Sequence, residues 1–259
     1  MKKFILGTCV LVVMLATTSF AQSNSSNNDW KGFYIGANLG GAFGGSHART
    51  STIDDPAGYF ATASVGEVNA AGDRHLDMNG FTGGGQIGYN ATFAKTLLFG
   101  LEADFGALSL DDTTSSTGTY SCCPGTGFTV GQQVSTNWLF TARPRVGVTF
   151  GKALVYGTAG VAITKVKFGQ LFTDTFDSAL EFGNDSVNKA GWTAGGGVEF
   201  KLASHWSAKG EYLYAGFGDE SHSSTNLTTA TEGSFPSSVF TQKVDLHANI
   251  IRAGINYRF

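Results

Sequence analysis

Two groups of residues in the last forty positions carry side chains suited to acyl-transfer chemistry. His222 is followed by Ser223 and Ser224, and Asp245 lies two residues before His247. A histidine oriented by an acidic residue can activate a serine hydroxyl for attack on an ester. Both groups fall in a polar stretch that we assign below to a long loop and to the outer end of the last strand, where such residues are common. We therefore predict no enzymatic activity and keep a lipid-A-modifying acyl hydrolase as an alternative.

A glycine-rich motif at residues 83–88, Gly-Gly-Gly-Gln-Ile-Gly, matches the G-x-G-x-x-G pattern of dinucleotide-binding loops. In that fold the motif opens a helix, whereas residues 89–93 continue here with the alternation of a strand. We therefore predict no nucleotide site, no cofactor and no metal centre. The glycines are better explained as relief of crowding where a strongly curved sheet bends.

The composition points to strands and excludes nucleic acid as a partner. The chain has 36 Gly, 21 Phe and only 4 Pro among 259 residues, and a glycine inside a helix costs about 1 kcal/mol relative to alanine. The formal net charge is -3, with 17 Lys and Arg residues spread along the chain. No basic stripe that could track phosphates results from this distribution.

The first 21 residues have the features of a secretory signal peptide. Lys2 and Lys3 precede an apolar run at 4–16, and Ser19-Phe20-Ala21 forms a small-x-small cleavage site. The run is shorter than the roughly 20 residues of a membrane-spanning helix. We expect no lipoprotein anchor, because no Cys follows the cleavage region and Cys9 lies inside the signal. We predict a signal peptide at 1–21, a short periplasmic segment at 22–32 and one domain at 33–259.

Cys122 and Cys123 are neighbours in the chain and are the two cysteines outside the predicted signal peptide. An exported protein meets an oxidising compartment, which favours a disulfide. Adjacent Cα atoms lie about 3.8 Å apart, closer than in most disulfides. We expect a vicinal disulfide and leave mixed disulfides or free thiols open.

Eight segments show the period-two alternation of strands. They are residues 33–43, 81–93, 97–108, 138–150, 153–165, 192–202, 206–217 and a last segment that ends at 259. In the fifth segment Leu154 and Tyr156 compete with Val155, Val161 and Ile163 for the apolar face, and we favour the latter set. Pro144 cannot donate to a ladder, so we expect a bulge or one missing hydrogen bond there.

The connections alternate between long polar stretches (44–80, 111–137, 166–191 and 218–243) and tight turns (94–96, 151–152 and 203–205). This asymmetry is typical of outer-membrane barrels, whose short turns face the periplasm and whose long loops face outward. The sequence therefore predicts an all-β, eight-stranded, antiparallel up-and-down transmembrane barrel.

A soluble eight-stranded barrel of the lipocalin type would have the same periodicity but the opposite facing. Three features favour apolar residues outside and polar residues inside: the export signal, aromatic residues at the segment ends, and a polar face rich in glycine and charges. The aromatic residues at the two levels are Phe43, Phe81, Trp138 and Trp192, and Phe93, Phe99, Phe150, Phe200, Trp206 and Phe259.

Charges on the polar face can be matched by counting from the tight turns. The counting opposes Glu199 to Lys209 and sets three further pairs at equal heights: Glu102 with Arg145, Asp104 with Arg143, and Glu211 with Arg252. Such pairs can satisfy one another or form a proton or ion path. Because an eight-stranded interior is only wide enough for side chains, we predict that these residues, with Tyr34 and Gln86, plug it.

Five stretches carry a resemblance to the alphaproteobacterial outer-membrane immunogenic proteins, a porin-like, OmpA-type barrel family. They begin at Trp30 (WKGFYIGANLGG), Tyr156 (YGTAGVA), Gly191 (GWTAGGGVE), Trp206 (WSAKGEYLY) and Ile251 (IRAGINYRF). The resemblance covers nearly the whole mature chain and implies a surface-exposed barrel with a structural or host-interaction role. It also implies that the ending with Tyr257 and Phe259 is read by the outer-membrane assembly machinery.

The predicted function is that of a structural outer-membrane protein that supports envelope integrity and contacts host or other surfaces through its long loops. A narrow porin-like channel for small solutes is the alternative from another functional class. The expected partners are outer-membrane lipid and lipopolysaccharide, the assembly machinery, and surface ligands of the loops.

Overall fold

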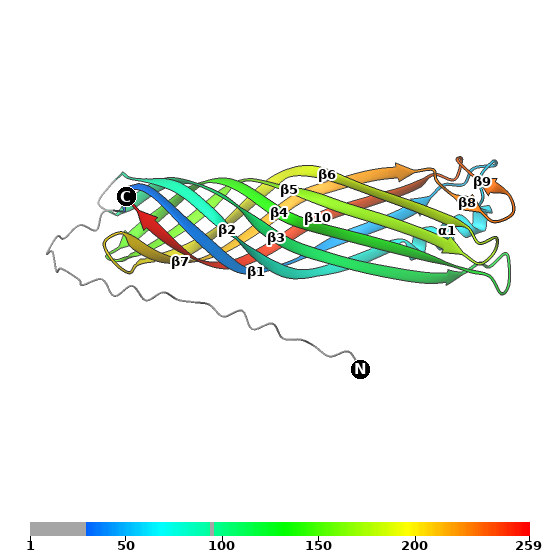
Figure 1. Ribbon diagram of the computed structural model, residues 1–259, viewed down its shortest axis with the longest axis horizontal. Helices are drawn as coiled ribbons and strands as arrows, with labels where there is room; N and C mark the ends of the chain where they lie inside the picture. The colour runs from blue at the N-terminus through cyan, green and yellow to red at the C-terminus, as the bar shows by residue number, and fades with distance from the viewer. Residues whose placement is uncertain (1–29, 94–95) are drawn as a thin grey trace, which may run out of the picture.

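The computed structural model describes residues 30–93 and 96–259, and the predicted signal peptide lies outside them (Figure 1). No helix in these ranges is long and apolar enough to cross a bilayer. The elements in chain order are β1 (Gly32–Thr52), α1 (Thr62–Ala71), β2 (Asp73–Thr92), β3 (Leu97–Thr119), β4 (Gly127–Phe150), β5 (Ala153–Asp174), β6 (Leu180–Lys201), β7 (Trp206–Ser224), β8 (Thr228–Thr229), β9 (Gly233–Ser234) and β10 (Phe240–Arg258).

The long strands close into a ring. Their order is β5-β4-β3-β2-β1-β10-β7-β6, and β6 pairs again with β5. All of these pairings are antiparallel. The start of β1 lies beside the end of β10 at the short-turn end, and α1, β8 and β9 lie at the opposite end (Figure 1). The predicted eight-stranded up-and-down barrel is thereby confirmed.

Near the short turns the outer face of the barrel is apolar. Side chains at least 40% exposed there include Phe33, Ile35, Leu39, Phe43, Phe81, Ile87, Phe99, Leu101, Phe105, Val146, Phe150, Val155, Val161, Trp192, Val198, Phe200, Trp206, Tyr212, Ile251 and Ile255. In β5, Val155 and Val161 point outward while Leu154 and Tyr156 are buried, so the favoured phase of that strand is confirmed. The apolar face is the one that meets lipid.

The strands are far longer than their sequence patterns predicted. They run for 19 to 24 residues, so the predicted long loops at 44–80, 111–137, 166–191 and 218–243 are mostly wrong. At the end opposite the short turns, the connections between the long strands are reduced to residues 53–72, 120–126, 175–179 and 225–239. We call these four connections the tip. The alternation continues into the regions predicted to be long loops, but there most of the apolar residues point inward, with Leu171, Leu180 and Phe182 exposed on the outer face.

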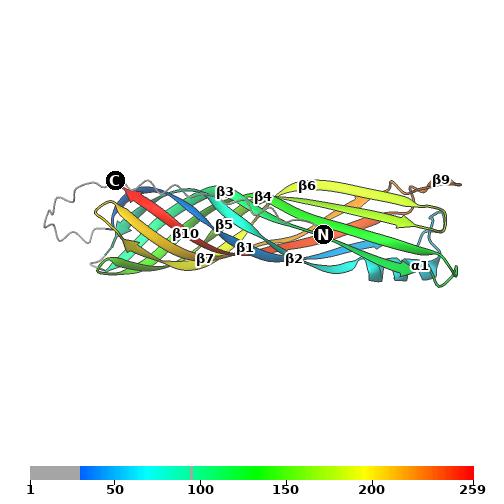
Figure 2. The ribbon, with the colours of Figure 1, turned by 60° about the horizontal axis from the view of Figure 1, so that its bottom comes forward.

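Beyond the lipid-facing belt the barrel divides into two sheets. The β2–β3 ladder ends at Phe81–Ser109 and the β6–β7 ladder at Trp192–Gly216, whereas the other six pairings continue toward the tip. Strands β7, β10, β1 and β2 form one four-stranded sheet and β3 to β6 form the other. We call the part up to these two pairs the barrel half and the part beyond it the sandwich half, which is the end that carries the labels α1 and β9 in Figure 2.

A glycine stands at each point where the ladders part. A Cβ atom on Gly80 would overlap the carbonyl oxygen of Ser109, and one on Gly191 would overlap the carbonyl oxygen of Gly216. The facing backbones approach too closely for any side chain at these positions. The two glycines therefore fix where the closed barrel becomes a two-sheet sandwich.

Pro144 interrupts a ladder without shifting it. The β4–β5 pairing passes from Ala142–Val161 to Arg145–Thr158 in the same register. Of the two expected irregularities, a bulge is therefore wrong, and the ladder lacks the hydrogen bond that a proline cannot donate. The Thr158 hydroxyl donates to the Pro144 carbonyl at 2.8 Å. Because Pro144 points outward, its ring adds to the lipid-facing surface.

Candidate functional site

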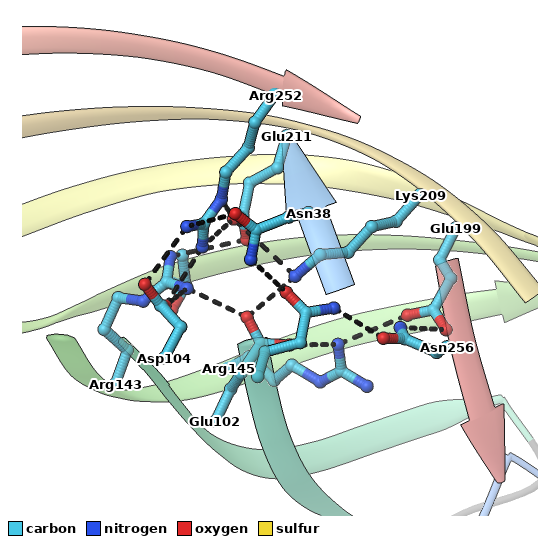
Figure 3. A network of polar contacts seen from close by, with 12 residues as sticks. Asn38, Glu102, Asp104, Arg143, Arg145, Glu199, Lys209, Glu211, Arg252 and Asn256 are labelled. Atoms are coloured by element: carbon cyan, nitrogen blue, oxygen red, sulfur yellow. Dashed lines mark hydrogen bonds and ion pairs between the residues drawn. The ribbon is translucent and has the colours of Figure 1, made fainter. Parts of the chain in front are cut away.

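Inside the barrel half, the eight charged residues singled out from the sequence lie together (Figure 3). They come from β3, β4, β6, β7 and β10, and each is at most 5% exposed: Glu102, Asp104, Arg143, Arg145, Glu199, Lys209, Glu211 and Arg252. Each sits on the inward phase of a strand whose neighbouring positions face lipid. Four acids and four bases make this charged layer neutral overall.

Arg143 is at the centre of the charged layer. Its Nη2 lies 2.8 Å from Glu102 Oε1 and 2.8 Å from Asp104 Oδ2, and its Nη1 lies 3.4 Å from Glu211 Oε1. Arg252 Nη2 lies 3.0 Å from Asp104 Oδ2 and 2.7 Å from Glu211 Oε2. Asp104 and Glu211 are thus each shared by two guanidinium groups, and the layer is a network rather than a set of separate pairs.

Three of the pairs obtained by counting are within ion-pair distance. These are Glu102–Arg145 at 3.4 Å, Asp104–Arg143 at 2.8 Å and Glu211–Arg252 at 2.7 Å. Glu199 and Lys209 are opposite in the β6–β7 ladder, but Lys209 Nζ lies 2.8 Å from Glu102 Oε1 on β3, and Glu199 Oε2 lies 3.3 Å from Arg145 Nη1.

The different partner of Lys209 follows from the shape of the ring. Strands β7 and β3 are four positions apart in the eight-strand order, so they face each other across the interior. A lysine side chain is long enough to cross a barrel this narrow. Counting along a hairpin finds neighbours on adjacent strands only, so this contact could not be read from the sequence.

Neutral side chains complete the network. The Tyr34 hydroxyl donates to Glu102 at 2.7 Å, the Tyr156 hydroxyl to Glu211 at 2.9 Å and the Asn256 amide to Glu199 at 3.0 Å. The Arg145 guanidinium lies 4.6 Å from the Tyr34 ring centre and 5.2 Å from that of Tyr156. The sequence placed Tyr34 inside the barrel but gave no partners for Tyr156 and Asn256. The alternation of their strands puts both side chains on the inward face, which is the one feature of the sequence that could have indicated their role.

At the short-turn end, Trp30 closes the interior. It is fully buried, and the Lys201 ammonium and the Arg258 guanidinium lie 4.9 Å and 4.8 Å from its ring centre. Together with Leu98 and Leu154 it forms a small apolar cluster. Trp30 belongs to the segment predicted to be periplasmic, yet it is part of the barrel interior.

Toward the tip, an apolar layer follows the charged one. It is a single cluster with members from both sheets, including Leu76, Met78, Leu110, Val134, Val166, Phe168, Phe217, Val244, Leu246 and Ile250. Polar residues such as Arg49, His75, Lys167 and Lys243 occupy the outer face at this height. The sandwich half is therefore built like a soluble β-sandwich and the barrel half like its reverse.

The histidine and serine groups do not form a hydroxyl–imidazole pair. His222 Nδ1 lies 3.1 Å from Asp185 Oδ2, whereas Ser223 bonds to Thr241 at 2.9 Å and Ser224 donates to Glu181. The His247 ring stacks on Tyr214, and Asp245 accepts the backbone N–H of His47 at 2.5 Å. No group of three or more His, Cys, Asp or Glu in the described ranges is arranged to hold a metal ion.

Two further predicted features lie at opposite ends of the molecule. Cys122 and Cys123 are joined as a vicinal disulfide in the connection 120–126 at the tip. At the short-turn end, the ring of Tyr257 contacts Trp206 with a centre distance of 5.1 Å, and the Phe259 N–H donates to Phe33 O at 3.0 Å. The last strand is therefore sealed onto β1 and β7.

Comparison with known proteins agrees with this architecture. The model of the outer membrane protein beta-barrel domain matches residues 12–259. The 31 kDa outer-membrane immunogenic protein of Brucella melitensis is 34% identical over 231 residues, which are 89% of this chain and 84% of that protein. The 22 kDa outer membrane protein of Rhizobium leguminosarum is 30% identical over 190 residues, 73% of this chain and 64% of that protein.

Among solved structures, OprG from Pseudomonas aeruginosa matches with 11% identity and a TM-score of 0.43, covering 88% of this chain and 97% of that one. Neisserial surface protein A matches with 14% identity and a TM-score of 0.38, covering 88% and 97%. On the family match and the Brucella relative, the chain belongs to the outer membrane protein beta-barrel domain family and is a protein of the bacterial outer membrane.

Proposed function

We propose that this protein is a structural outer-membrane barrel with a non-conducting interior, which presents its sandwich half and tip outside the cell for contact with surfaces or host molecules. The observation that carries the proposal is the filling of the interior by successive side-chain layers. Trp30, the charged layer and the apolar cluster around Phe168 follow one another along the axis. Envelope integrity is served by the same filling, because a packed barrel leaves no leak.

The order of the layers supports closure on energetic grounds. A hydrated ion that passed the neutral charged layer would next have to enter an apolar layer, where the loss of its water costs many kcal/mol. An eight-stranded interior is in any case only wide enough for side chains. The protein is therefore proposed to be silent as a channel.

Single-channel recording in planar bilayers tests this proposal. The protein is delivered to the planar bilayer by fusion of protein-containing vesicles, and protein recovered from the same vesicle preparation should change its gel mobility on boiling, as folded barrels do. A silent membrane with incorporated, heat-modifiable protein is the expected result. Discrete conductance steps would overturn the proposal and favour the narrow porin-like channel.

A non-enzymatic role is supported by the hydrogen bonds of the histidine and serine groups. The hydroxyls of Ser223 and Ser224 are engaged by Thr241 and Glu181 rather than by His222. Incubation of the purified protein with lipid A should release no acyl chain. Release that disappears in the His222→Ala or His247→Ala variant would establish the acyl hydrolase instead.

We propose two partners for the barrel, lipopolysaccharide and the outer-membrane assembly machinery. Lys165 and Lys167 on β5 lie just beyond the outward-facing Val161, at the height where phosphates of lipopolysaccharide would lie, and we assign them to that contact. The sealed final strand with Tyr257 and Phe259 is assigned to recognition by the assembly machinery. Lys165→Gln with Lys167→Gln should lower the amount of lipopolysaccharide that co-purifies with the protein. Removal of Phe259 should lower the yield of folded barrel.

A further inference from the structure

The tip carries negative charge only. Its four connections, 53–72, 120–126, 175–179 and 225–239, contain five acidic residues and no Lys, Arg or His. The acidic residues are Asp54, Asp55, Glu67, Asp177 and Glu232. The adjoining strand ends carry Arg49, Arg74 and Lys243, and Arg49 is paired with Asp73 at 3.5 Å. A positively charged molecule is therefore attracted to this end.

Three of these acidic side chains are held in place by hydrogen bonds within and between the connections of the tip. Asp177 accepts a hydrogen bond from the Thr231 hydroxyl at 2.6 Å, Asp55 accepts one from Ala57 N at 2.8 Å, and Glu67 accepts one from Ser121 N at 3.1 Å. Hydrogen bonds from Thr231 and Thr229 lower the pKa of Asp177. Asp54 and Glu232 are exposed. The negative charge is thus positioned but not neutralised by these contacts.

A small aromatic pocket lies among these loops. Its volume is about 120 Å³, and its walls include Tyr59, Phe60, Tyr120, Phe176 and the Cys122–Cys123 disulfide. Three of the four connections supply these residues, so the pocket exists only when the tip is folded. Sites for drug-sized ligands measure about 300 to 1,000 Å³, so this pocket has the size for one side chain rather than for a larger molecule.

Buried Asp174 fixes the walls of the pocket. It accepts hydrogen bonds from the Tyr59 hydroxyl at 2.7 Å, the Tyr120 hydroxyl at 3.0 Å and Ala179 N at 3.0 Å. Burial, together with this carboxylate, raises the pKa of both tyrosines far above the ordinary value. Both rings therefore stay neutral at the pH of living cells, and their orientations are set before any ligand arrives.

Aromatic walls inside an acidic surrounding suit a cation on an apolar stem. The face of an aromatic ring attracts an ammonium or guanidinium group, and the stem of Lys or Arg can lie along apolar surface. Phe176 is 58% exposed and Ile53 48% exposed, so apolar contact continues outside the pocket. A neutral apolar side chain would fit the walls but would gain nothing from the five carboxylates.

We propose that the tip binds a basic polypeptide segment, with one Arg or Lys side chain in the aromatic pocket and further cations on the surrounding carboxylates. The spread of the acidic residues over the loops favours a chain with several charges over a small amine. This inference rests on the proposed surface-contact function and names the chemical class of the partner.

The test uses full-length protein folded in nanodiscs of neutral lipid, with fluorescence polarisation of a labelled hexa-arginine peptide. Binding should weaken steeply between about 50 and 300 mM salt, because surface charges are screened. A peptide of the same length with citrulline in place of arginine keeps the shape but lacks the charge and should not bind. Equal binding of the citrulline peptide, or no binding of the arginine peptide, would overturn the proposal.

Two exposed phenylalanines on the β5–β6 hairpin provide a matched pair of variants. Phe176→Ala removes a pocket wall and should weaken binding about tenfold, between the effects of an exposed and of a fully desolvated cation–aromatic contact. Phe182→Ala removes a ring that is 53% exposed on the outer face of β6 and should leave binding unchanged. Equal effects of the two variants would show that the pocket is not the site.

Asp54→Asn with Glu232→Gln replaces two exposed carboxylates, leaves the walls of the aromatic pocket unchanged and should reduce the salt dependence of peptide binding. Spermine that competes as well as the peptide at equal charge concentration would reassign the site to small polyamines. The two proposals can fail separately. Channel conductance would overturn the proposed function whether or not the peptide binds. A silent, surface-exposed barrel that does not bind the peptide would overturn only this inference.

Discussion

Removal of Arg252 is the sharpest test of the charged layer. Its guanidinium contacts Asp104 at 3.0 Å and Glu211 at 2.7 Å, and the side chain is 3% exposed. Arg252→Met keeps the stem but leaves these carboxylates short of one positive charge. Breaking a buried ion pair from one side costs about 3 to 5 kcal/mol. Because Arg143 also contacts both carboxylates, at 2.8 and 3.4 Å, we expect the lower end of this range.

The double variant Arg252→Met with Glu211→Gln restores neutrality and should recover more than half of the lost free energy of unfolding. The assay is urea unfolding in lipid vesicles, followed by tryptophan fluorescence and by the mobility shift on boiling. Arg49→Met on the outer surface serves as the control and should change stability by about 0.5 kcal/mol or less. Additive losses in the double variant would refute the interpretation that charge balance stabilises the interior.

Two further predictions concern the backbone and the pH dependence. Gly80→Ala places a methyl group against the Ser109 carbonyl oxygen and should lower the urea midpoint strongly. Gly66→Ala in α1 has open space around it and should raise the free energy of unfolding by up to about 1 kcal/mol. Similar midpoints for the two variants would contradict the close approach of the β2 and β3 backbones at Gly80. Burial raises the pKa of Glu181 above its ordinary value of 4.5, so the folded state favours the protonated carboxyl. The stabilising contribution of that proton is complete below the ordinary pKa and is lost as the pH rises through the folded value. Glu181→Gln should therefore be more stable relative to the parent at pH 7 than at pH 4 in paired urea titrations, and a difference that does not change with pH would count against this assignment.

The barrel half could be predicted from the sequence because lipid imposes a strict rule. Every second residue from Phe33 to Phe43 must be apolar and the alternate ones fill a narrow interior, so period, phase and charge positions were all readable. Counting from tight turns also located the inward charges. It could not find the contact between Lys209 and Glu102, which depends on closure of the ring.

The sandwich half was missed because the rule reverses there. Residues such as Leu76, Met78 and Phe168 are apolar but face inward, so a search for outward apolar alternation ends the strands at the edge of the belt. The glycines Gly80 and Gly191 mark the change, yet in a chain with 36 glycines nothing in the sequence singles them out. The aromatic pocket likewise depends on three connections that meet only in the folded chain.

Quenching of single tryptophans by brominated lipids tests most directly which face of the barrel meets the membrane. Three variants would each keep one of Trp30, Trp192 and Trp206, with the other tryptophans replaced by phenylalanine. Trp192 and Trp206 are 56% and 46% exposed on the outer face, whereas Trp30 is fully buried inside. The account predicts strong quenching of Trp192 and Trp206 and none of Trp30, and quenching of Trp30 with unchanged emission from the other two would contradict it.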